Sequence, residues 1–499
     1  MATRAVTLRR AGVRPLVWAA VATVTVLIAH LPSFAHRLLD GDEAVYGTIA
    51  ALMNTGARLY AEGGVDNKPP GIFWVYAATF EVFGRYQMTA IHAVELAVVL
   101  ATCAVLVAVG RTIQCPRAGL LAAVLYGLLT ATGNPRLLAA NTEVFMSLPL
   151  AAAFLLMLRR QWLWSAFLMV VAGLFKQVAA IDVLLLPAGL LLLEPPPTRF
   201  RAGLLFAAGI AAGLGAGAAL LGLTGSLEGF WRWTVQTLAG YASQNWRPDI
   251  LWSRSRDSLI PFVLYGAVPW IAAVALVTRW RELRPGERLA IVWLAASVVG
   301  AVAAGHWAWH YFVQVMAPLS LLAGLALDRA LNWESRRWVG AVALAGVLVP
   351  VLYWMNFDVR ADPLTYDWTP PVAQHEQVAQ YIASHTRPGD RVFVWGVWPA
   401  LYVESDRLMA SRFPGFLRGF ARGSSLPPNN WDTAPDVWPE LGSDLQRNPP
   451  ALIIDTSAAG WSDFSMYPMS SYPVLAQLVA ADYKPVATVD GVVIYGRIT

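Results

Sequence analysis

The chain has 499 residues, of which 57% are hydrophobic and only 14% are charged, and its mean hydropathy is +0.49. Soluble globular proteins are much less apolar, so the composition excludes that class and indicates a polytopic membrane protein. The pI near 9.2 comes almost wholly from arginine, because lysine occurs only at Lys68, Lys176 and Lys484. Since the arginines stand between apolar segments, where they orient helices, we exclude nucleic-acid binding.

Soluble nucleotide chemistry and disulfide scaffolding have no support in the sequence. It contains no P-loop, no GxGxxG followed by a soluble βαβ unit, no HExxH and no CxxC. The two cysteines, Cys103 and Cys115, are too few and too badly placed for a disulfide framework, so we interpret them as packing residues.

Apolar segments recur along the first 355 residues. A spanning helix needs roughly 20 apolar residues, fewer where its ends snorkel, and this rule predicts about eleven spans. They cover residues 16–34, 89–110, 118–132, 142–158, 161–175, 178–193, 202–223, 259–277, 289–305, 311–328 and 338–355. The fold class predicted from this pattern is a polytopic α-helical membrane protein.

The loops between the spans alternate in character, and arginines fill every second short loop. The arginine-rich ones contain Arg4 to Arg14, Arg111 and Arg117, Arg159 and Arg160, Arg199 and Arg201, the run 278–288, and Arg329 to Arg337. By the positive-inside rule they face the cytoplasm, which places the N-terminus inside and the C-terminal region outside. The same alternation makes residues 68–85 a helix lying in the outer interface rather than a span. A cleavable signal peptide remains an alternative for the first span.

The composition changes near residue 358, where charges and prolines appear and apolar runs shorten to strand length. Helical spacing over 374–386 and 473–483 alternates with apolar runs at 391–395, 451–457 and 492–498. We therefore predict a transmembrane domain over residues 1–357, with an external loop over 35–88, and an external α/β domain over residues 358–499.

Three carboxylates, Asp40, Asp42 and Glu43, directly follow the first span in "HRLLDGDEAVYGTIA". Asp42 and Glu43 are expected to cap a helix running to about Gly56 and to interact favourably with its dipole. Capping needs only one carboxylate, so the cluster also suggests a general base or a cation site.

Two lysines are candidate anion ligands. Lys68 precedes tandem prolines in "DNKPPG", which present its ammonium from a stiff extended segment. Lys176 interrupts an apolar hairpin in "LFKQVAAID", where a lysine is a functional candidate by default. Interfacial anchoring and snorkelling are the structural alternatives. Most basic residues of this chain are arginines, yet these two positions have lysine. The compact ammonium of lysine suits a phosphate oxygen, so both lysines are candidates to bind one phosphate.

Further candidates lie in the predicted external loops. His306, His310 and Tyr311 stand in "GHWAWHYFVQVMAP", and a histidine there is able to hydrogen-bond a phosphate or a sugar hydroxyl. Glu143 begins the fourth span, where the structural alternative is a helix-start acid. An aromatic-rich loop supplies the remaining candidates, for which interfacial anchoring is the alternative to sugar stacking: Trp231, Tyr241, Trp246 and Arg247.

These motifs together resemble the GT-C membrane glycosyltransferases, in the bacterial branch related to protein O-mannosyltransferases and the lipid A aminoarabinose transferase. The resemblance is carried in order by "GDEAVYGTIA", "NKPPGIFWVY", "ANTEVFMSLPL", "GLFKQ" and "HYFVQVMAPL". It implies transfer of a sugar from a polyprenyl-phosphate donor to a hydroxyl of a protein, lipid or polysaccharide, outside a bacterial cytoplasmic membrane.

The resemblance also implies roles for residues. It makes Asp42 the catalytic base with Glu43 beside it, Lys68 a ligand of the donor phosphate, and Lys176 the match to the family's second lysine. We predict Lys176 and, from its own chemistry, His310 as further ligands of this phosphate. Candidate contacts to the sugar or acceptor are Asp40, Tyr46, Glu143, Tyr241, Trp246, Arg247 and Tyr311. With the base and the leaving phosphate on opposite faces of the sugar, the expected stereochemical outcome is inversion.

This chain differs from the family pattern at one position that concerns a metal cofactor. The aminoarabinose transferase has an acid before its KPP-type lysine that contributes to a metal site, whereas this chain has Asn67. No cofactor is therefore implied with certainty, and Asp40, Asp42 and Glu43 are the candidate ligands of a divalent cation.

Two alternative functions stay open. One is a transporter or flippase of lipid-linked saccharide, with Asp42, Glu143 and Lys176 as coupling residues. The other is a non-catalytic membrane protein whose C-terminal domain binds glycan.

Overall fold

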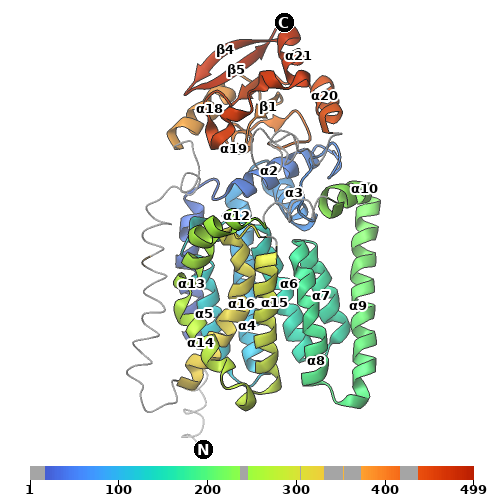
Figure 1. Cartoon of the computed structure of the whole chain (residues 1–499), viewed down its shortest axis with the longest axis vertical. Coiled ribbons are helices and arrows are strands. Elements are labelled where there is room, and N and C mark those ends of the chain that lie inside the picture. The colour runs from blue at the N-terminus through green and yellow to red at the C-terminus, as the bar shows by residue number, and fades with distance from the viewer. Residues whose placement is uncertain are drawn as a thin grey trace, which may run out of the picture. The chain divides into compact units, whose positions relative to one another are not determined.

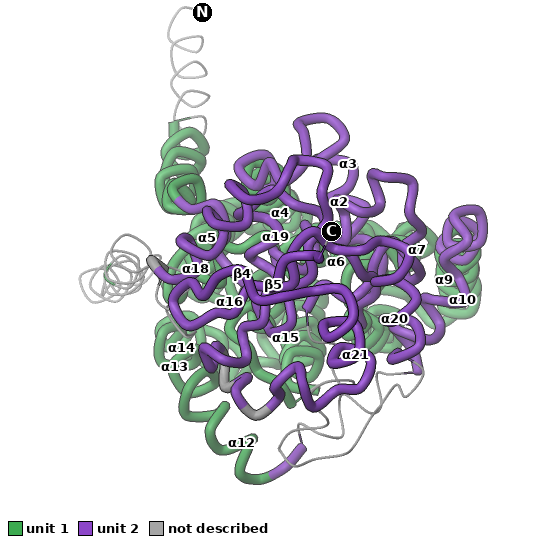
Figure 2. Tube along the Cα trace, turned by 90° about the horizontal axis from the view of Figure 1, so that it is seen from above, with its two compact units in different colours: residues 1–35, 92–216, 248–361 green, residues 36–91, 217–247, 362–499 purple. Residues whose placement is uncertain are grey.

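The structure is a computed structural model that describes residues 17–236, 246–303, 305–330, 352, 372–415 and 437–498. Its contacts divide the chain into two units, each assembled from separate parts of the sequence (Figure 2). Unit 1 consists of Met1–Ala35, His92–Ala216 and Pro248–Ala361, and unit 2 of His36–Ile91, Gly217–Arg247 and Asp362–Thr499.

Unit 1 is a bundle of apolar helices (Figure 1). Besides the helix Val17–Phe34, its described elements are α4 (Met88–Thr112), α5 (Pro116–Leu129), η2 (Pro135–Leu137), α6 (Thr142–Leu158), α7 (Trp162–Gly173), η3 (Gln177–Leu184), α8 (Leu185–Leu193), α9 (Pro196–Leu223), α12 (Pro248–Arg254), η5 (Ser255–Leu259), α13 (Ile260–Tyr265), α14 (Ala267–Val277), η6 (Trp280–Glu282), α15 (Pro285–Ala303), η7 (Trp309–Phe312) and α16 (Val313–Ala330). The first residues of α4 and the last of α9 belong to unit 2.

Among the described residues, five helices are long and apolar enough to cross a membrane: Val17–Phe34, Met88–Thr112, Pro196–Leu223, Pro285–Ala303 and Trp309–Ala330. The pair Pro248–Tyr265 and Ala267–Val277, bent by 71°, would make a sixth. The predicted spans within residues 116–193 correspond to shorter apolar helices, and the one at 338–355 falls almost wholly outside the described residues. The count of about eleven spans therefore stays a prediction.

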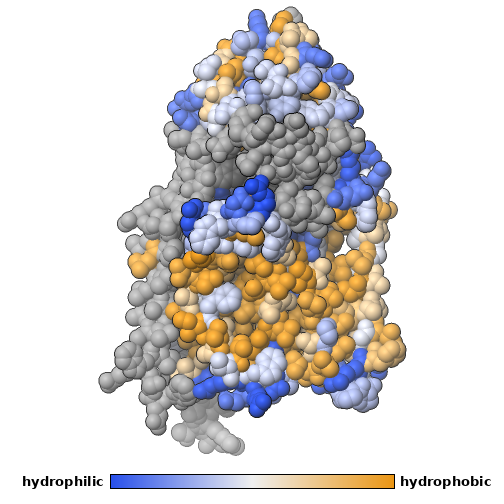
Figure 3. Space-filling model, in the orientation of Figure 1, coloured by the Kyte–Doolittle hydropathy of each residue, from blue (hydrophilic) through white to orange (hydrophobic). Residues whose placement is uncertain are grey.

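Hydrophobic residues gather on the surface of the helices of unit 1 in the space-filling view (Figure 3). Exposed large side chains include Trp164 on α7, Leu204 on α9 and Ile271 on α14, which are 57%, 56% and 70% exposed. So broad an exposed apolar surface suits lipid rather than water as the surrounding solvent.

Small residues allow neighbouring helices of unit 1 to approach closely. A Cβ added at Gly110 of α4 would lie 2.4 Å from the Cα of Gly119 on α5, and one added at Gly324 of α16 would lie 2.4 Å from the carbonyl oxygen of Ala118. Backbones that approach this closely are typical of packed membrane helices. On α9, Gly209 makes an equally close approach to α7, whereas a Cβ at Gly215 would meet nothing within 4 Å.

Unit 2 contains a five-stranded sheet of β1 (Arg391–Trp395), β2 (Leu408–Met409), β3 (Leu452–Asp455), β4 (Tyr483–Val489) and β5 (Val492–Arg497). Its helices are α2 (Gly41–Met53), α3 (Gly71–Phe83), α10 (Leu227–Phe230), η4 (Trp231–Gln236), α18 (Val372–Ser384), α19 (Ala400–Ser405), α20 (Val437–Arg447), η9 (Trp461–Met466), η10 (Met469–Ser471) and α21 (Pro473–Asp482). The strand order is β2-β1-β3-β5-β4, with β1 parallel to both its neighbours and β5 antiparallel to β3 and β4.

The small C-terminal α/β fold confirms the alternation predicted from the sequence. Strands β1, β3 and β5 and helix α21 lie within the predicted segments, and helix α18 overlaps the segment predicted at 374–386. Strand β4 was not predicted, and it contains Pro485, a residue that is rare in strand interiors. The structure accommodates it at the sheet edge, where the pairing with β5 shifts register between Pro485 and Ala487.

The segment after the first span joins the C-terminal domain in unit 2. The Nε of Arg85 lies 2.9 Å from Oδ1 of Asp406, and the N–H of Val65 donates to the carbonyl of Arg412 over 3.0 Å. The predicted domain boundary near residue 358 falls outside the described residues, so its position stays a prediction.

Candidate functional site

The three acids at the start of α2 have different hydrogen-bond partners. Asp40 is the N-cap residue, and its carboxylate accepts the N–H of Asp42 over 3.3 Å. Glu43 is fully buried and accepts the N–H of Leu39 over 2.7 Å. The expectation that Asp42 and Glu43 cap the helix was therefore wrong in part: Asp40 supplies the cap, and the other two acids belong to the first turn.

Asp42 has a different environment from its two neighbours. Its side chain is 30% exposed, and one carboxylate oxygen lies 3.6 Å from the ammonium of Lys68. The hydroxyl of Tyr46, one turn later on α2, donates to the same oxygen over 3.3 Å. The structure therefore brings Asp42, Tyr46 and Lys68 together, and leaves part of the Asp42 carboxylate accessible.

Lys68 is held by its backbone as well as by its charge. Its N–H donates to Asp66 over 2.9 Å, and its carbonyl accepts the hydroxyl of Tyr60 over 2.7 Å. The ammonium lies 3.8 Å from Asp66, and the residue is only 8% exposed. Burial raises the pKa of Tyr60 well above its usual value, so the hydroxyl keeps the proton that it donates.

Asp66 and Tyr60 were missed from the sequence. Asp66 stands two residues before Lys68, where a side-chain hydrogen bond to the backbone is common, so the signal was present in "VDNKPP". Tyr60 gave none. It lies in the left-handed region at φ 62°, and its contact with the Lys68 carbonyl exists only because the loop folds back before α3.

A second polar cluster lies in unit 1. Lys176, at the N-terminal edge of η3, forms an ion pair with Glu143 in the first turn of α6, and both side chains are buried. Thr142 donates to the other oxygen of Glu143 over 2.8 Å. The Lys176 ammonium also lies 3.2 Å from the centre of the Tyr311 ring, a close cation–π contact.

The histidines of the predicted motif flank this cluster. The rings of His310 and His306 lie 4.9 and 5.5 Å from the ring of Tyr311, and the carboxylate of Glu143 interacts electrostatically with His310. The structure thus brings Glu143, Lys176, His310 and Tyr311 together, although they come from three separate parts of the sequence.

The aromatic-rich loop is described only in part. Trp231 begins η4 and is 58% exposed. Trp246 is 53% exposed, and Arg247 directly precedes α12. Tyr241 lies outside the described residues. The roles assigned to Tyr241, Trp246 and Arg247 stay predictions.

The three acids do not form a plausible cation site. Asp40 and Glu43 each accept a backbone N–H, and Asp42 faces the ammonium of Lys68, which competes with any cation. Within the described ranges, no group of three or more His, Cys, Asp or Glu side chains is arranged to hold a metal ion. We therefore derive no chemical step through a metal.

Comparison with known proteins gives structural matches alone. No protein-family model and no curated protein matches the sequence. The structure is similar to that of ArnT from Cupriavidus metallidurans bound to undecaprenyl phosphate, with a TM-score of 0.59 and 17% identity over 97% of this chain and 98% of that one.

Two further structures match with TM-scores of 0.52. The oligosaccharyltransferase of Archaeoglobus fulgidus tethered to an acceptor peptide is 10% identical, over 96% of this chain and 74% of that one. The mycobacterial arabinofuranosyltransferase AftD is 14% identical, over 97% of this chain and 40% of that one. At these identities the likeness establishes the fold alone: the chain is a polytopic helical membrane protein with the GT-C fold.

Proposed function

We propose that the protein is a glycosyltransferase that moves a sugar from a polyprenyl-phosphate donor to a hydroxyl acceptor. The observation that carries this proposal is the partly exposed carboxylate of Asp42, 3.6 Å from the ammonium of Lys68, in a chain with the GT-C fold. Structures with this fold have been solved with undecaprenyl phosphate and, in the archaeal oligosaccharyltransferase, with dolichol phosphate and with an acceptor peptide.

Asp42 acts as the general base in the proposed reaction. Its carboxylate takes the proton of the acceptor hydroxyl while the hydroxyl oxygen attacks the anomeric carbon of the sugar. The bond from the anomeric carbon to the donor phosphate breaks on the opposite face, and the configuration inverts. Tyr46, which donates to Asp42, orients the carboxylate.

Lys68 binds the donor phosphate and stabilises the charge that develops on it as it leaves. Its position is set before the donor arrives, because the Tyr60 hydroxyl and the Asp66 carboxylate hold the backbone on both sides of its Cα. The two prolines that follow restrict the chain further. A preorganised cation of this kind avoids the cost of ordering a mobile lysine during the reaction.

Lys176 and His310 remain the predicted further ligands of the phosphate. The charge of Lys176 is balanced by Glu143 in the described structure, so phosphate binding there requires that the ammonium leave this ion pair. The proposed location is the outer face of a bacterial cytoplasmic membrane, which rests on the distribution of arginines between the loops.

The test is to measure transfer and donor binding separately in the purified protein. Asp42→Asn is expected to lower the transfer rate by about 10²–10⁴-fold while donor binding is kept. Lys68→Ala is expected to weaken binding of the polyprenyl-phosphate sugar. The matched control is Asp257→Asn, which changes an exposed acid that pairs with Arg256 on unit 1. Full activity of the Asp42→Asn protein would remove the base assignment.

A transporter of lipid-linked saccharide is the second candidate. It is favoured by the buried ion pair of Glu143 and Lys176, because buried charges within membrane helices often mark substrate pathways. Liposomes that contain the protein distinguish the two functions. Exchange of lipid-linked sugar across the bilayer, with no cleavage of any polyprenyl-phosphate sugar, would establish transport and exclude the transferase.

A further inference from the structure

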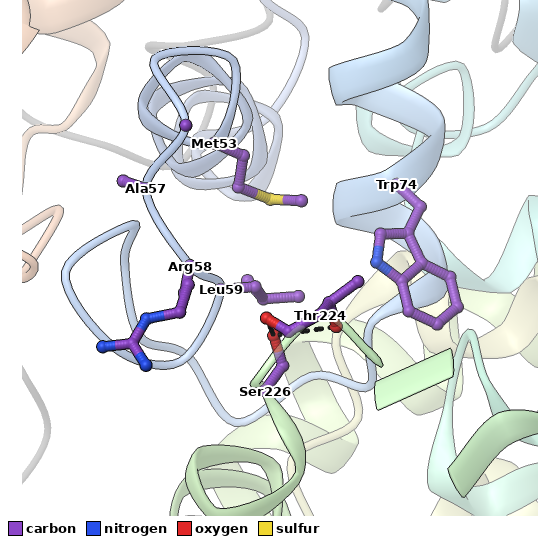
Figure 4. Close-up of a pocket in the computed structure, with 8 residues that line it drawn as sticks. Met53, Ala57, Arg58, Leu59, Trp74, Thr224 and Ser226 are labelled. Carbon is purple, nitrogen blue, oxygen red and sulfur yellow. Dashed lines mark hydrogen bonds between the residues drawn. The ribbon is translucent and has the colours of Figure 1, made fainter. Parts of the chain in front are cut away.

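Unit 2 contains an open pocket of about 280 Å³ beside the end of α2 (Figure 4). It is lined by Met53, Gly56, Ala57, Arg58, Leu59, Trp74, Thr224 and Ser226. These residues come from the end of α2, the loop after it, α3 and the α9–α10 junction. None of them belongs to the Asp42 and Lys68 site, so the pocket is a separate feature of the same unit.

The walls of the pocket combine an aromatic plane with hydroxyl groups. Figure 4 shows Met53 above the space, Trp74 to its right, and Leu59, Thr224 and Ser226 along its lower side. The Thr224 hydroxyl lies 3.2 Å from the Ser226 hydroxyl and 3.0 Å from the carbonyl of Leu220. Hydroxyls that donate in this way keep oxygen lone pairs to accept a hydrogen bond from a ligand.

The pocket carries no net charge. The guanidinium of Arg58 extends away from the central space and pairs with Glu62 through two hydrogen bonds of 3.0 and 3.2 Å. Arg58 lowers the pKa of Glu62 to about 2, so the carboxylate is ionised at neutral pH and balances the arginine. An anionic ligand such as a phosphate would therefore find little attraction here.

We propose that this pocket binds a neutral sugar ring of the acceptor, at a distance from the point of transfer. A sugar ring offers C–H groups to an indole face and hydroxyls to Thr224 and Ser226, which matches the lining. This inference rests on the proposed glycosyltransferase function.

The position of the pocket defines the kind of acceptor. Met53 follows Asp42 by eleven residues of the same helix, which corresponds to about 16 Å along its axis. This span exceeds a single sugar ring. The acceptor would therefore be a glycan or glycolipid with more than one sugar, whose distal ring occupies the pocket while a hydroxyl elsewhere on it meets Asp42.

A lipid chain is the competing occupant. Leu223 and Leu227, which flank the lining hydroxyls in the chain, are 87% and 46% exposed. A lipid chain would use Met53, Leu59 and Trp74 but would leave both hydroxyls without a ligand partner. A neutral ring would use both the aromatic side chain and the two hydroxyls, which makes it the better match to the lining.

The experiment measures sugar contact by saturation-transfer NMR, with the full chain in lipid nanodiscs. The probes are the methyl glycosides of mannose, glucose, galactose and arabinose. The variants are Trp74→Ala and Trp74→Phe, with Trp164→Ala as the matched control because Trp164 is an exposed tryptophan on α7. We expect Trp74→Ala to weaken binding of at least one probe by about tenfold, while Trp74→Phe and Trp164→Ala retain it.

Different results test the sugar site and the transferase activity. Absence of contact with every probe in the wild type, or equal loss in Trp74→Ala and Trp164→Ala, would overturn the sugar site. Loss of a co-purified phospholipid from Trp74→Ala alone would establish a lipid pocket instead. Cleavage of a polyprenyl-phosphate sugar by the wild type, measured on the same preparation, decides the transferase function independently.

Discussion

Three acids within four residues have different surroundings because α2 begins between them. Asp40 has extended backbone angles and accepts an N–H of the first turn, whereas Glu43 is buried and bonded to the N–H of Leu39. Asp42 points its carboxylate to Lys68 and Tyr46. Two of the acids thus stabilise the helix start, and the third is the one that we propose as the general base.

The ion pair of Glu143 and Lys176 gives a prediction at the same scale. Glu143→Gln leaves a buried ammonium without its counter-charge, and we expect a loss of about 3–5 kcal/mol in unfolding free energy. The double variant Glu143→Gln with Lys176→Met removes both charges and should lose much less. Unfolding in mixed micelles measures both effects.

The control for this pair is Glu282→Gln, which changes the exposed pair of Arg279 and Glu282. An exposed pair contributes at most about 1 kcal/mol, so this variant should behave like the wild type. A double variant as unstable as Glu143→Gln alone would contradict the explanation from an uncompensated charge.

At the scale of elements, α4 and α5 meet through two glycines. Gly110→Ala would place a Cβ 2.4 Å from the Cα of Gly119, so the helices must separate. We expect a loss of about 1–3 kcal/mol in unfolding free energy. Gly215→Ala on α9 is the matched control, because it is also a helical glycine but its Cβ would meet nothing within 4 Å. Equal stability of the two variants would disprove the close-packing argument.

The end of β3 gives a prediction about pH. Burial raises the pKa of the Asp455 carboxyl, although hydrogen bonds from Ser457 act in the opposite direction. Because the folded pKa exceeds the unfolded value, the unfolded state loses its proton first as pH rises. The contribution of this group to stability is therefore complete below about pH 4 and is lost as pH rises through the folded pKa.

Asp455→Asn removes this titration. As pH rises from about 4 to 7, the melting temperature of the variant should increase relative to that of the wild type. Thermal unfolding of the full chain at several pH values measures it. If the difference between the two melting temperatures stays constant with pH, burial does not raise the pKa of Asp455.

At the scale of the whole molecule, unit 2 joins a segment near the start of the chain to its C-terminal domain. The guanidinium of Arg412 binds Asp444 through two hydrogen bonds of 2.9 Å, and the carbonyl of Arg412 accepts the N–H of Val65. Asp444 thereby fixes the backbone that holds the loop before Lys68. The C-terminal domain is part of the support of the candidate site.

Hydrogen exchange tests this connection. Asp444→Ala removes the hydrogen bonds that hold Arg412 and leaves its 3.5 Å ion pair with Glu440. We expect the amide of Val65 to exchange at least about tenfold faster, because its acceptor is held less firmly. Amides in the middle of α16 should not change. The control is Asp257→Ala, which breaks an exposed pair in unit 1. Unchanged exchange at Val65 in the Asp444→Ala protein would mean that the domain does not stabilise this loop.

The sequence by itself determined the parts of the protein that depend on local pattern. Apolar runs predicted the helices, the alternation after residue 372 predicted three strands and two helices, and ordered motifs indicated the GT-C fold. Even the Asp66 and Lys68 contact had a local signal. These features were predictable because a helix, a strand or a turn depends on residues within a few positions of one another.

Only the tertiary structure decided which distant residues meet. Glu143 and Lys176 are 33 residues apart, Val65 meets Arg412, and β4 is stable because its proline lies at a sheet edge. Such contacts depend on how apolar faces pack and on where each backbone group finds a partner. Neither is encoded in the spacing of nearby residues, so the acid facing Lys68 and the pocket beside Trp74 became visible only in the folded chain.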